Sequence, residues 1–220
     1  MKLTRIIPLC IALCISPHVF SEDLGPYAAA RKCTYVALEP GTYFEIFGHS
    51  NTTYKVSNLA GLSKADVFTL SYFSQYPDED KTLDAIVNSI KNKIPFVSNQ
   101  FTNDAVRKLH SLHGGDLTAI NDRRRSLEVA IKTNLQKPKD VWKAGLLIHA
   151  YGDTFAHTKG GYASSDEKAF GPAVGHLFHS ILGENPDQVT KDINKVKYLA
   201  YVNSLFNLLR VEDARINYFY

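Results

Sequence analysis

Apolar side chains recur at helical spacing along most of the chain, and strict alternation is rare. Ser63 is a residue type that caps helix N-termini, with Asp66 three positions later, and the stripe that follows predicts a helix that Pro77 ends. The stripe consists of Val67, Leu70, Phe73 and Tyr76.

The same periodicity predicts further helices at about 52–59, 80–92, 102–112, 116–134, 138–158 and 172–182. After Pro186, a long helix is expected to run almost to Tyr220. Its apolar stripe is expected to lie in the core and consists of Val196, Leu199, Val202, Phe206 and Leu209. Residues 34–47 fit a short hairpin or an extended arm, and 159–165 fit a flexible loop. The predicted fold is one all-α helical-bundle domain.

The N-terminus has the pattern of a secretory signal. Lys2 and Arg5 precede an apolar run, Ile6 to Ile15, that is too short to span a bilayer. Cleavage is expected between Ser21 and Glu22, which predicts a signal peptide at 1–21, an N-terminal arm at 22–48 and a helical metal-site domain at 49–220. The protein is then secreted or periplasmic; the alternative is an N-terminal membrane anchor.

Composition and charge exclude several classes of protein. Of the 220 residues, 45% are apolar and 21% are charged, which is typical of a folded domain rather than a disordered chain. Loss of the signal lowers the formal charge from +3 to +1, so no stable nucleic-acid complex is expected. Cys10 and Cys14 leave with the signal, and Cys33 alone forms no internal disulfide. A core, a bound metal, or both must stabilise the domain.

The densest chemical signal is His149, Asp153 and His157, spaced four residues apart in an apolar segment. Steps of four keep side chains on one helix face, with a drift of about 40° per step. Two imidazoles and a carboxylate suit zinc and similar divalent ions, and buried groups of this kind need partners. Gly152 within the segment indicates close approach by another backbone or by a substrate.

Helix bundles build metal centres from inward-facing side chains on several helices, so other His and Asp residues are candidates for the same site. His110 is preferred to His113, which precedes Gly114 and Gly115 at an expected helix end. The choice between His176 and His179 stays open. The predicted ligands are His49, Asp78, His110, His149, Asp153, His157 and His176, and Asp187 is a further candidate.

Three blocks of the chain resemble an uncharacterised bacterial helical family related to the zinc-dependent phospholipase C and single-strand nuclease superfamily. The first block contains His49, the sequence AGLS at 60–63 and SQYPDE at 74–79; the second is LHSL at 109–112; the third is the 149–157 helix with Gly175-His176 and Pro186-Asp187. The better-known members also use an N-terminal tryptophan as a ligand. A chain beginning near Glu22 lacks one, so one or two zinc ions are expected rather than three.

The resemblance and the ligand set together imply hydrolysis of a phosphate ester, most similar to phospholipase C, with a phospholipid or other phosphodiester as substrate and peripheral contact with a membrane. Asp153 or Asp78 would bridge two ions or accept the proton of the attacking water. The alternatives are a single-strand nuclease and a non-catalytic envelope or binding protein whose structural metal has a closed coordination sphere.

Overall fold

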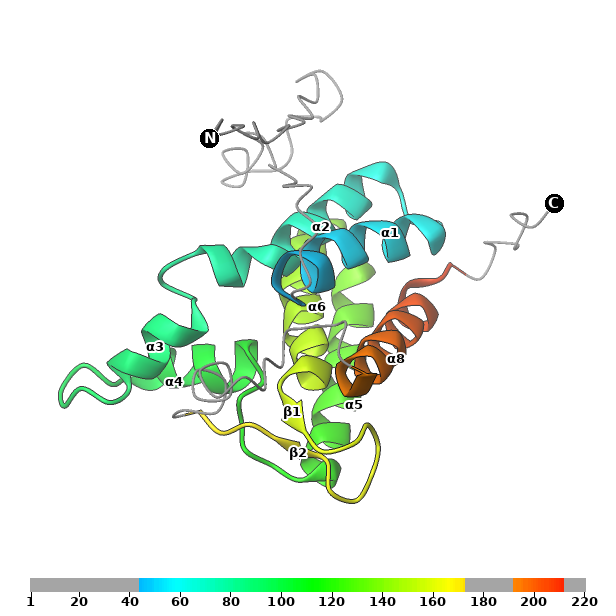
Figure 1. The fold of residues 1–220 in the computed structure, drawn as a ribbon. Coiled ribbons are helices and arrows are strands. Elements are labelled where there is room, and N and C mark those ends of the chain that lie inside the picture. The colour runs from blue at the N-terminus through cyan, green and yellow to red at the C-terminus, as the bar shows by residue number, and fades with distance from the viewer. Residues whose placement is uncertain (1–43, 173–191, 212–220) are drawn as a thin grey trace, which may run out of the picture. The chain divides into compact units, whose positions relative to one another are not determined.

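The computed structural model describes residues 44–172 and 192–211, which lie within the unit Thr42–Tyr220. Helices dominate these residues (Figure 1), which confirms the all-α prediction. In chain order the elements are η3 (Phe44–Asn51, a π-helix), α1 (Thr52–Leu59), α2 (Lys64–Glu79), α3 (Ala85–Lys91), α4 (Gln100–Asp104), η4 (Ala105–Leu109, a π-helix), α5 (Leu117–Leu135), η5 (Pro138–Asp140, a 3₁₀ helix), α6 (Val141–Ala156), β1 (Thr158–Lys159), β2 (Lys168–Ala169) and α8 (Asp192–Leu209). The predicted signal peptide and most of the helix expected at 172–182 lie outside the described residues.

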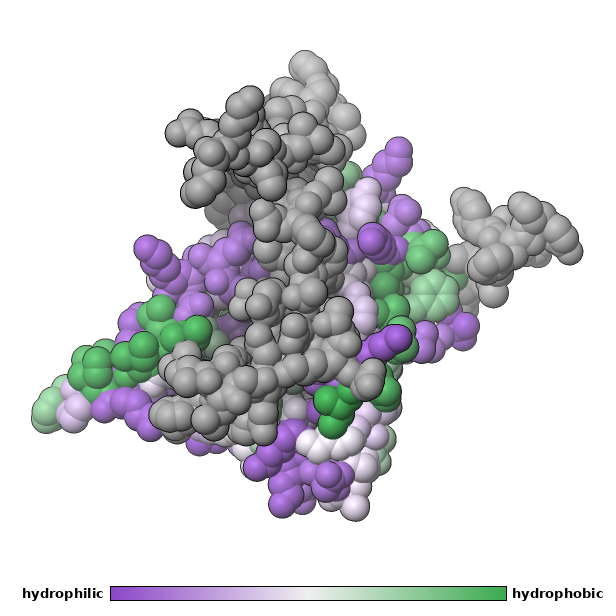
Figure 2. Space-filling view, viewed as in Figure 1, coloured by the Kyte–Doolittle hydropathy of each residue, from purple (hydrophilic) through white to green (hydrophobic). Residues whose placement is uncertain are grey.

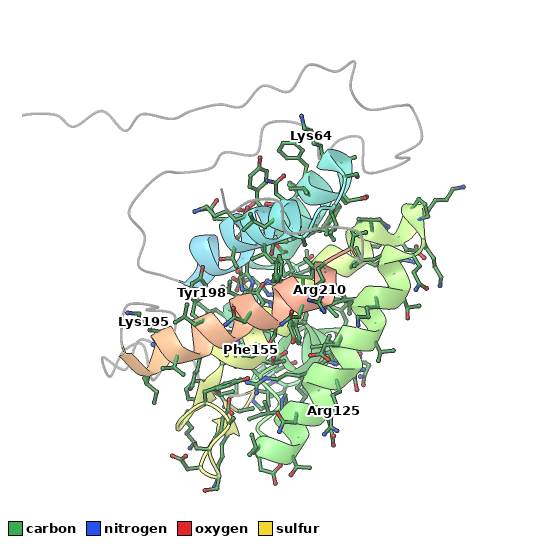
Figure 3. All side chains as sticks on the ribbon, turned by 90° about the vertical axis from the view of Figure 1, so that its right-hand side faces the viewer. Lys64, Arg125, Phe155, Lys195, Tyr198 and Arg210 are labelled. Carbon is green, nitrogen blue, oxygen red and sulfur yellow. The ribbon has the colours of Figure 1, made fainter. Side chains whose placement is uncertain are left out.

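Helix α6 lies at the centre of the described helices, and α2, α5 and α8 pack against it. Phe155 of α6 lies beside α8 in Figure 3, and its ring centroid is 5.7 Å from that of Tyr201. The core side chains with at most 2% of their surface exposed include Leu70, Leu127, Ile131, Ile148, Tyr151, Phe155, Tyr201 and Leu205. Burial of these side chains is the main source of stability.

Two glycines let neighbours approach α6 closely. A Cβ atom on Gly145 would lie 2.5 Å from the Cβ of Phe73, so the absence of a side chain lets α2 sit against α6. A Cβ atom on Gly152 would lie 3.1 Å from Cε1 of His49. The close approach predicted at Gly152 is therefore present, and a side chain makes it rather than a backbone or a substrate.

Helix α2 continues to Glu79, and the prediction that Pro77 ends it was wrong. The helix loses the hydrogen bond that a backbone N–H at position 77 would donate, but Pro77 lies in the last turn, where the loss is confined. The backbone N–H of Asp80 donates to the carbonyl of Tyr76 at 3.0 Å and closes the helix beyond the proline. Asp78 consequently lies on α2 instead of in a solvated turn. The predicted cap at Ser63 is confirmed, since its hydroxyl oxygen accepts from the N–H of Asp66.

Other boundaries differ from the sequence predictions. The helix expected at 80–92 is the shorter α3, because Asp84 is its N-cap and accepts from the N–H of Val87 at 2.7 Å. The hairpin or arm expected to end at Phe47 is helical from Phe44 onwards. Of the stripe predicted for the last helix, Leu209 is buried, but Val196 and Leu199 are 55% and 50% exposed.

The predicted loop at 159–165 lies almost entirely between the short strands β1 and β2, so it is the loop of a two-stranded hairpin instead of a link between two helices. A buried ion pair holds it, with Nη2 of Arg124 on α5 3.0 Å from Oε1 of Glu167. Thr158 donates to the same carboxylate oxygen, and Nζ of Lys197 on α8 donates to the carbonyl of Thr158 at 2.7 Å. The hairpin thus joins α5 to α8. Among the described residues, no helix has both the length and the apolar character that crossing a bilayer requires.

Candidate metal centre

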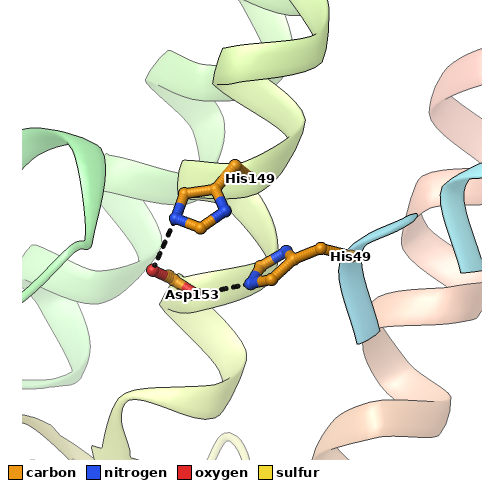
Figure 4. A group of neighbouring side chains, drawn as sticks. All are labelled: His49, His149 and Asp153. Atoms are coloured by element: carbon orange, nitrogen blue, oxygen red, sulfur yellow. Dashed lines mark ion pairs between the residues drawn. The ribbon is translucent and has the colours of Figure 1, made fainter. Parts of the chain in front are cut away.

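Asp153 lies between two histidine side chains (Figure 4). Its Oδ2 atom is 3.3 Å from Nε2 of His149, one turn earlier on α6, and its Oδ1 atom is 3.1 Å from Nε2 of His49. The rings of His49 and His149 have centroids 4.1 Å apart. All three side chains are at most 3% exposed. The step of four that the sequence shows does place His149 and Asp153 on one buried face.

Three further elements bring the remaining members of the cluster to α6. His49 lies in η3, Asp78 in the last turn of α2, and His110 directly after η4. His110 is 1% exposed, and Asp78 is the most accessible member, with 25% of its side chain exposed. The structure therefore brings together five of the seven predicted ligands, namely His49, Asp78, His110, His149 and Asp153. We call these five the His/Asp cluster.

Backbone carbonyls fix the orientation of two imidazoles. Nδ1 of His149 lies 2.9 Å from the carbonyl oxygen of Ser74, and Nε2 of His110 lies 2.9 Å from that of Leu83. A carbonyl oxygen only accepts, so each of these ring nitrogens carries a hydrogen and donates it. The other nitrogen of each ring points into the cluster, as in metal-ligating histidines whose second nitrogen donates to a carbonyl.

These two inward-pointing nitrogens face each other at hydrogen-bond distance. Nε2 of His149 and Nδ1 of His110 are 3.1 Å apart, and each is 3.3 Å from Oδ2 of Asp153. Oδ2 of Asp153 is buried and makes no hydrogen bond of good geometry. If neither nitrogen carried a proton, these atoms would repel one another at such distances. Protonation of a ring or a bound metal ion would relieve that repulsion.

The spacing of the ligand atoms fits a tetrahedral ion. Ligands at zinc distances of 2.0–2.1 Å stand about 3.3–3.4 Å apart in a regular tetrahedron. Oδ1 of Asp78 lies 3.7 Å from Nδ1 of His110 and 3.8 Å from Nε2 of His149, and these three residues form one group that could hold an ion. A small inward movement of Asp78, the most exposed member, would bring its oxygen to the tetrahedral distance from both nitrogens.

Both carboxylates also face His49 with their second oxygen. Oδ1 of Asp153 is 3.1 Å and Oδ2 of Asp78 is 3.9 Å from Nε2 of His49. Each carboxylate thus has one oxygen toward His110 and His149 and the other toward His49. Two overlapping groups could hold a metal ion, one formed by His49, His149 and Asp153 and the other by Asp78, His110 and His149.

The electrostatics favour an ionised carboxylate at the centre. Burial alone would raise the pKa of Asp153, but the charges of His157 and His149 hold it well below its usual range. Burial lowers the pKa of His49, yet the hydrogen bond and charge of Asp153 outweigh burial and raise that pKa above 6.5. Asp153 is therefore ionised at neutral pH and available to a cation.

His157 lies beside the cluster. Its Nδ1 atom is 3.5 Å from Oδ2 of Asp153 but only 2.7 Å from the carbonyl oxygen of His110, to which it donates. That nitrogen is occupied by the hydrogen bond, and the geometry gives His157 a positioning role near His110. His113 lies outside the cluster, where its Nδ1 accepts from the N–H of Gly115. His176, His179 and Asp187 lie outside the described residues.

No family model, no curated protein and no solved structure matches the chain. The resemblance to the phospholipase C and nuclease superfamily therefore stays a prediction, and support for a metal ion comes from the geometry of the His/Asp cluster.

No sequence pattern indicated the groups that orient the cluster. The backbone carbonyls of Ser74, Leu83 and His110 hold three imidazoles, and any residue type supplies a carbonyl. The buried pair of Arg124 and Glu167 also went unpredicted. Forty-three residues separate its members along the chain, and each resembles an ordinary surface charge when only the sequence is known.

Proposed function

We propose that the protein is an exported, metal-dependent hydrolase of phosphate esters, with zinc as the ion and a phospholipid headgroup as the substrate class. The inward-pointing nitrogens of His110 and His149, 3.1 Å apart beside a buried carboxylate oxygen, carry the proposal because two imidazole nitrogens and a carboxylate are a ligand set that suits zinc. The shared carboxylates support a two-ion site. The phospholipid substrate is supported by the resemblance of the three sequence blocks.

The two carboxylates would have different roles. A bound divalent ion lowers the pKa of its water to about 7 and so supplies a nucleophile at neutral pH. Asp153 is 2% exposed and its oxygens are 3.1–3.3 Å from the imidazoles, so it holds the cluster together. Asp78 is 25% exposed with distances of 3.7–3.9 Å, and its looser carboxylate is placed to accept a proton where substrate enters.

A structural metal site is the second candidate. Oxygens of Asp78 and Asp153 with nitrogens of His110 and His149 form four protein ligands, enough to close one tetrahedral sphere. The position at His49 has fewer described ligands, namely one nitrogen and two carboxylate oxygens, and such an incomplete set favours the catalytic alternative.

The test compares wild-type mature protein with Asp153→Asn, purified without chelator or histidine tag. We expect the wild type to contain zinc by elemental analysis, to melt at a lower temperature after chelation, and to hydrolyse bis-(p-nitrophenyl) phosphate. Asp153→Asn keeps the side-chain size but removes the charge, so metal and activity should both be lost. His113→Gln is the matched control, because His113 lies outside the cluster and should change neither.

Each result has a clear reading. Zinc without hydrolysis of this ester, phosphatidylcholine or single-stranded DNA would favour the structural site. Cleavage of DNA but not lipid would establish the nuclease alternative. Wild-type protein that is free of metal, and whose melting temperature changes with neither chelator nor added zinc, would contradict the proposal.

A further inference from the structure

A segment from Ile86 to Phe101 places its apolar side chains on the surface. It comprises α3, the turns that follow and the start of α4, and we call it the apolar arm. Figure 2 shows hydrophobic surface gathered where α3 and these turns lie. The exposed fractions are 46% for Ile86, 54% for Ile90, 45% for Ile94, 106% for Phe96, 42% for Val97 and 55% for Phe101. A contiguous patch of this kind marks an interaction surface.

The interior of the arm is polar. From Ile86 to Asp104 the two buried side chains are Asn88 and Thr102. Nδ2 of Asn88 donates to the carbonyls of Thr82 and Asp84, at 2.9 Å each. Oγ1 of Thr102 donates to Oδ1 of Asn92 at 2.5 Å, which ties α3 to α4. Hydrogen bonds thus hold the arm in shape, and its isoleucines and phenylalanines are left for a partner.

The tip of the arm presents a whole aromatic ring. Phe96 has a backbone φ of 67°, a region that bulky residues rarely occupy. Its side chain is fully exposed, so no contact within the described structure compensates for that conformation. Ile94 and Val97 flank the ring on the same turn and are also exposed. An aromatic side chain at such a tip is suited to insertion among lipid acyl chains.

The charges of the arm are positive. Lys91 and Lys93 lie between Asp84 and Asp104, and no acidic residue stands between those two aspartates. Asp104 itself pairs with Lys108 at 3.0 Å. Lysines beside exposed apolar side chains complement a surface with negative headgroups and an apolar interior. We propose that the apolar arm docks the protein on an anionic lipid surface. Docking goes beyond the proposed hydrolase activity, because the arm contains no member of the His/Asp cluster.

The root of the arm adjoins the cluster. The carbonyl of Leu83, two residues before α3, accepts the hydrogen bond that orients the ring of His110. The arm that would bind the lipid surface is therefore connected directly, through Leu83, to the cluster member His110. A lipid surface also accommodates apolar side chains of any shape, whereas a protein partner would need a matching face.

The experiment measures binding of the mature protein to vesicles by cosedimentation, with phosphatidylglycerol–phosphatidylcholine mixtures compared with phosphatidylcholine alone. We expect preferential binding to the anionic vesicles. Phe96→Ser should lower the partition coefficient at least tenfold, since the ring no longer leaves water. Lys91→Gln and Lys93→Gln should each lower it about fivefold. Val129→Ser is the matched control, because Val129 is 66% exposed on α5, away from the arm, and should bind as wild type.

A second readout guards against misfolded variants. Phe96→Trp keeps an apolar ring, and its fluorescence, after subtraction of the Trp142 emission of the wild type, should shift to the blue on anionic vesicles and not on buffer dilution. Asp153→Asn should bind vesicles as wild type does, which separates docking from metal-dependent activity. An unchanged partition coefficient for Phe96→Ser, or no blue shift for Phe96→Trp, would overturn the proposal. If the wild type were a dimer that does not bind vesicles, and if Phe96→Ser were a monomer, the arm would instead bind a second copy of the chain.

Discussion

At the scale of single residues, the cluster depends on which ring nitrogen carries the proton. Ser74 and Leu83 contribute only carbonyl oxygens, yet these fix the hydrogen-bearing nitrogens of His149 and His110 and direct the opposite lone pairs inward. His157 acts one step further out, through the carbonyl of His110. His149, Asp153 and His157 therefore differ in how much metal binding depends on them.

His149 and His157 should respond differently to substitution. His149→Ala removes a ligand nitrogen and should abolish zinc binding. His157→Asn keeps an N–H donor close to the position of Nδ1, so the hydrogen bond to His110 should survive with a loss in zinc affinity of less than about tenfold. Zinc competition with a fluorescent chelator measures both. Complete loss of zinc from His157→Asn would identify His157 as a ligand through its other nitrogen.

At the scale of elements, α6 packs against α2 on one part of its surface and contributes side chains to the His/Asp cluster on another, and each part contains a glycine at a close contact. Gly145 gives room to α2, and Gly152 gives room to the ring of His49. Because alanine raises helix propensity by about 1 kcal/mol at either position, only the neighbours distinguish the two substitutions.

Gly145→Ala should destabilise the protein by about 1–3 kcal/mol, since the new methyl group would meet the Cβ of Phe73 at 2.5 Å. For a unit of this size, that corresponds to a fall in melting temperature of roughly 2–10 °C. Gly152→Ala meets the His49 ring at 3.1 Å and should change melting little, but it should weaken zinc binding at the His49 position. Calorimetry measures the melting temperatures of the two variants, and zinc titration measures their affinities. Equal melting temperatures for Gly145→Ala and Gly152→Ala would contradict the assigned contacts.

The same elements show what the sequence could and could not predict. The step from His149 to Asp153 is local, so helix geometry alone placed both on one face. His49 reaches Asp153 only through tertiary packing, and its candidacy came from residue type and resemblance. The prediction that Pro77 ends the helix was wrong because proline is tolerated in a last turn when the helix ends shortly afterwards. The prediction that Val196 and Leu199 lie in the core was wrong because a helical period does not show which of two apolar stripes on a helix packs against the core.

At the scale of the whole molecule, the cluster couples metal binding to folding. Its members come from η3, α2, the end of η4 and α6, so an unfolded chain offers no preformed site. Binding of zinc to the folded state therefore adds directly to the free energy of unfolding.

The pH dependence of stability should have opposite signs with and without zinc. In metal-free protein, the raised pKa of His49 gives stability that is present below its unfolded value of 6.5 and is lost as pH rises through the folded value. The lowered pKa of Asp153 gives stability above its unfolded value of 3.8, so it stays constant over this range. Metal-free protein should melt at a higher temperature at pH 6 than at pH 8. Zinc binding releases protons, so zinc-loaded protein should show the reverse.

Thermal melts at both pH values, with chelator and with zinc, measure this effect. The control is His49→Gln, which should flatten the dependence of the metal-free protein. His113, whose pKa burial lowers, is present in both chains and cancels in the comparison. The assignment would be contradicted if the metal-free wild type melted at a higher temperature at pH 8 than at pH 6, and if His49→Gln showed the same difference.

The position of α8 has a consequence for the timing of folding. The hydroxyls of Thr52 and Tyr198 meet at 2.6 Å across a sequence separation of 146 residues, and the backbone N–H of Val211 donates to the carbonyl of Ala60. Tyr201 and Leu205 of α8 are fully buried in the core. A nascent chain that has emerged only as far as α6 lacks these partners, so the earlier helices cannot close their core during synthesis. Folding of this unit is therefore completed after translation of its last helix, and a chain truncated before Asp192 should be a substrate for chaperones or proteases.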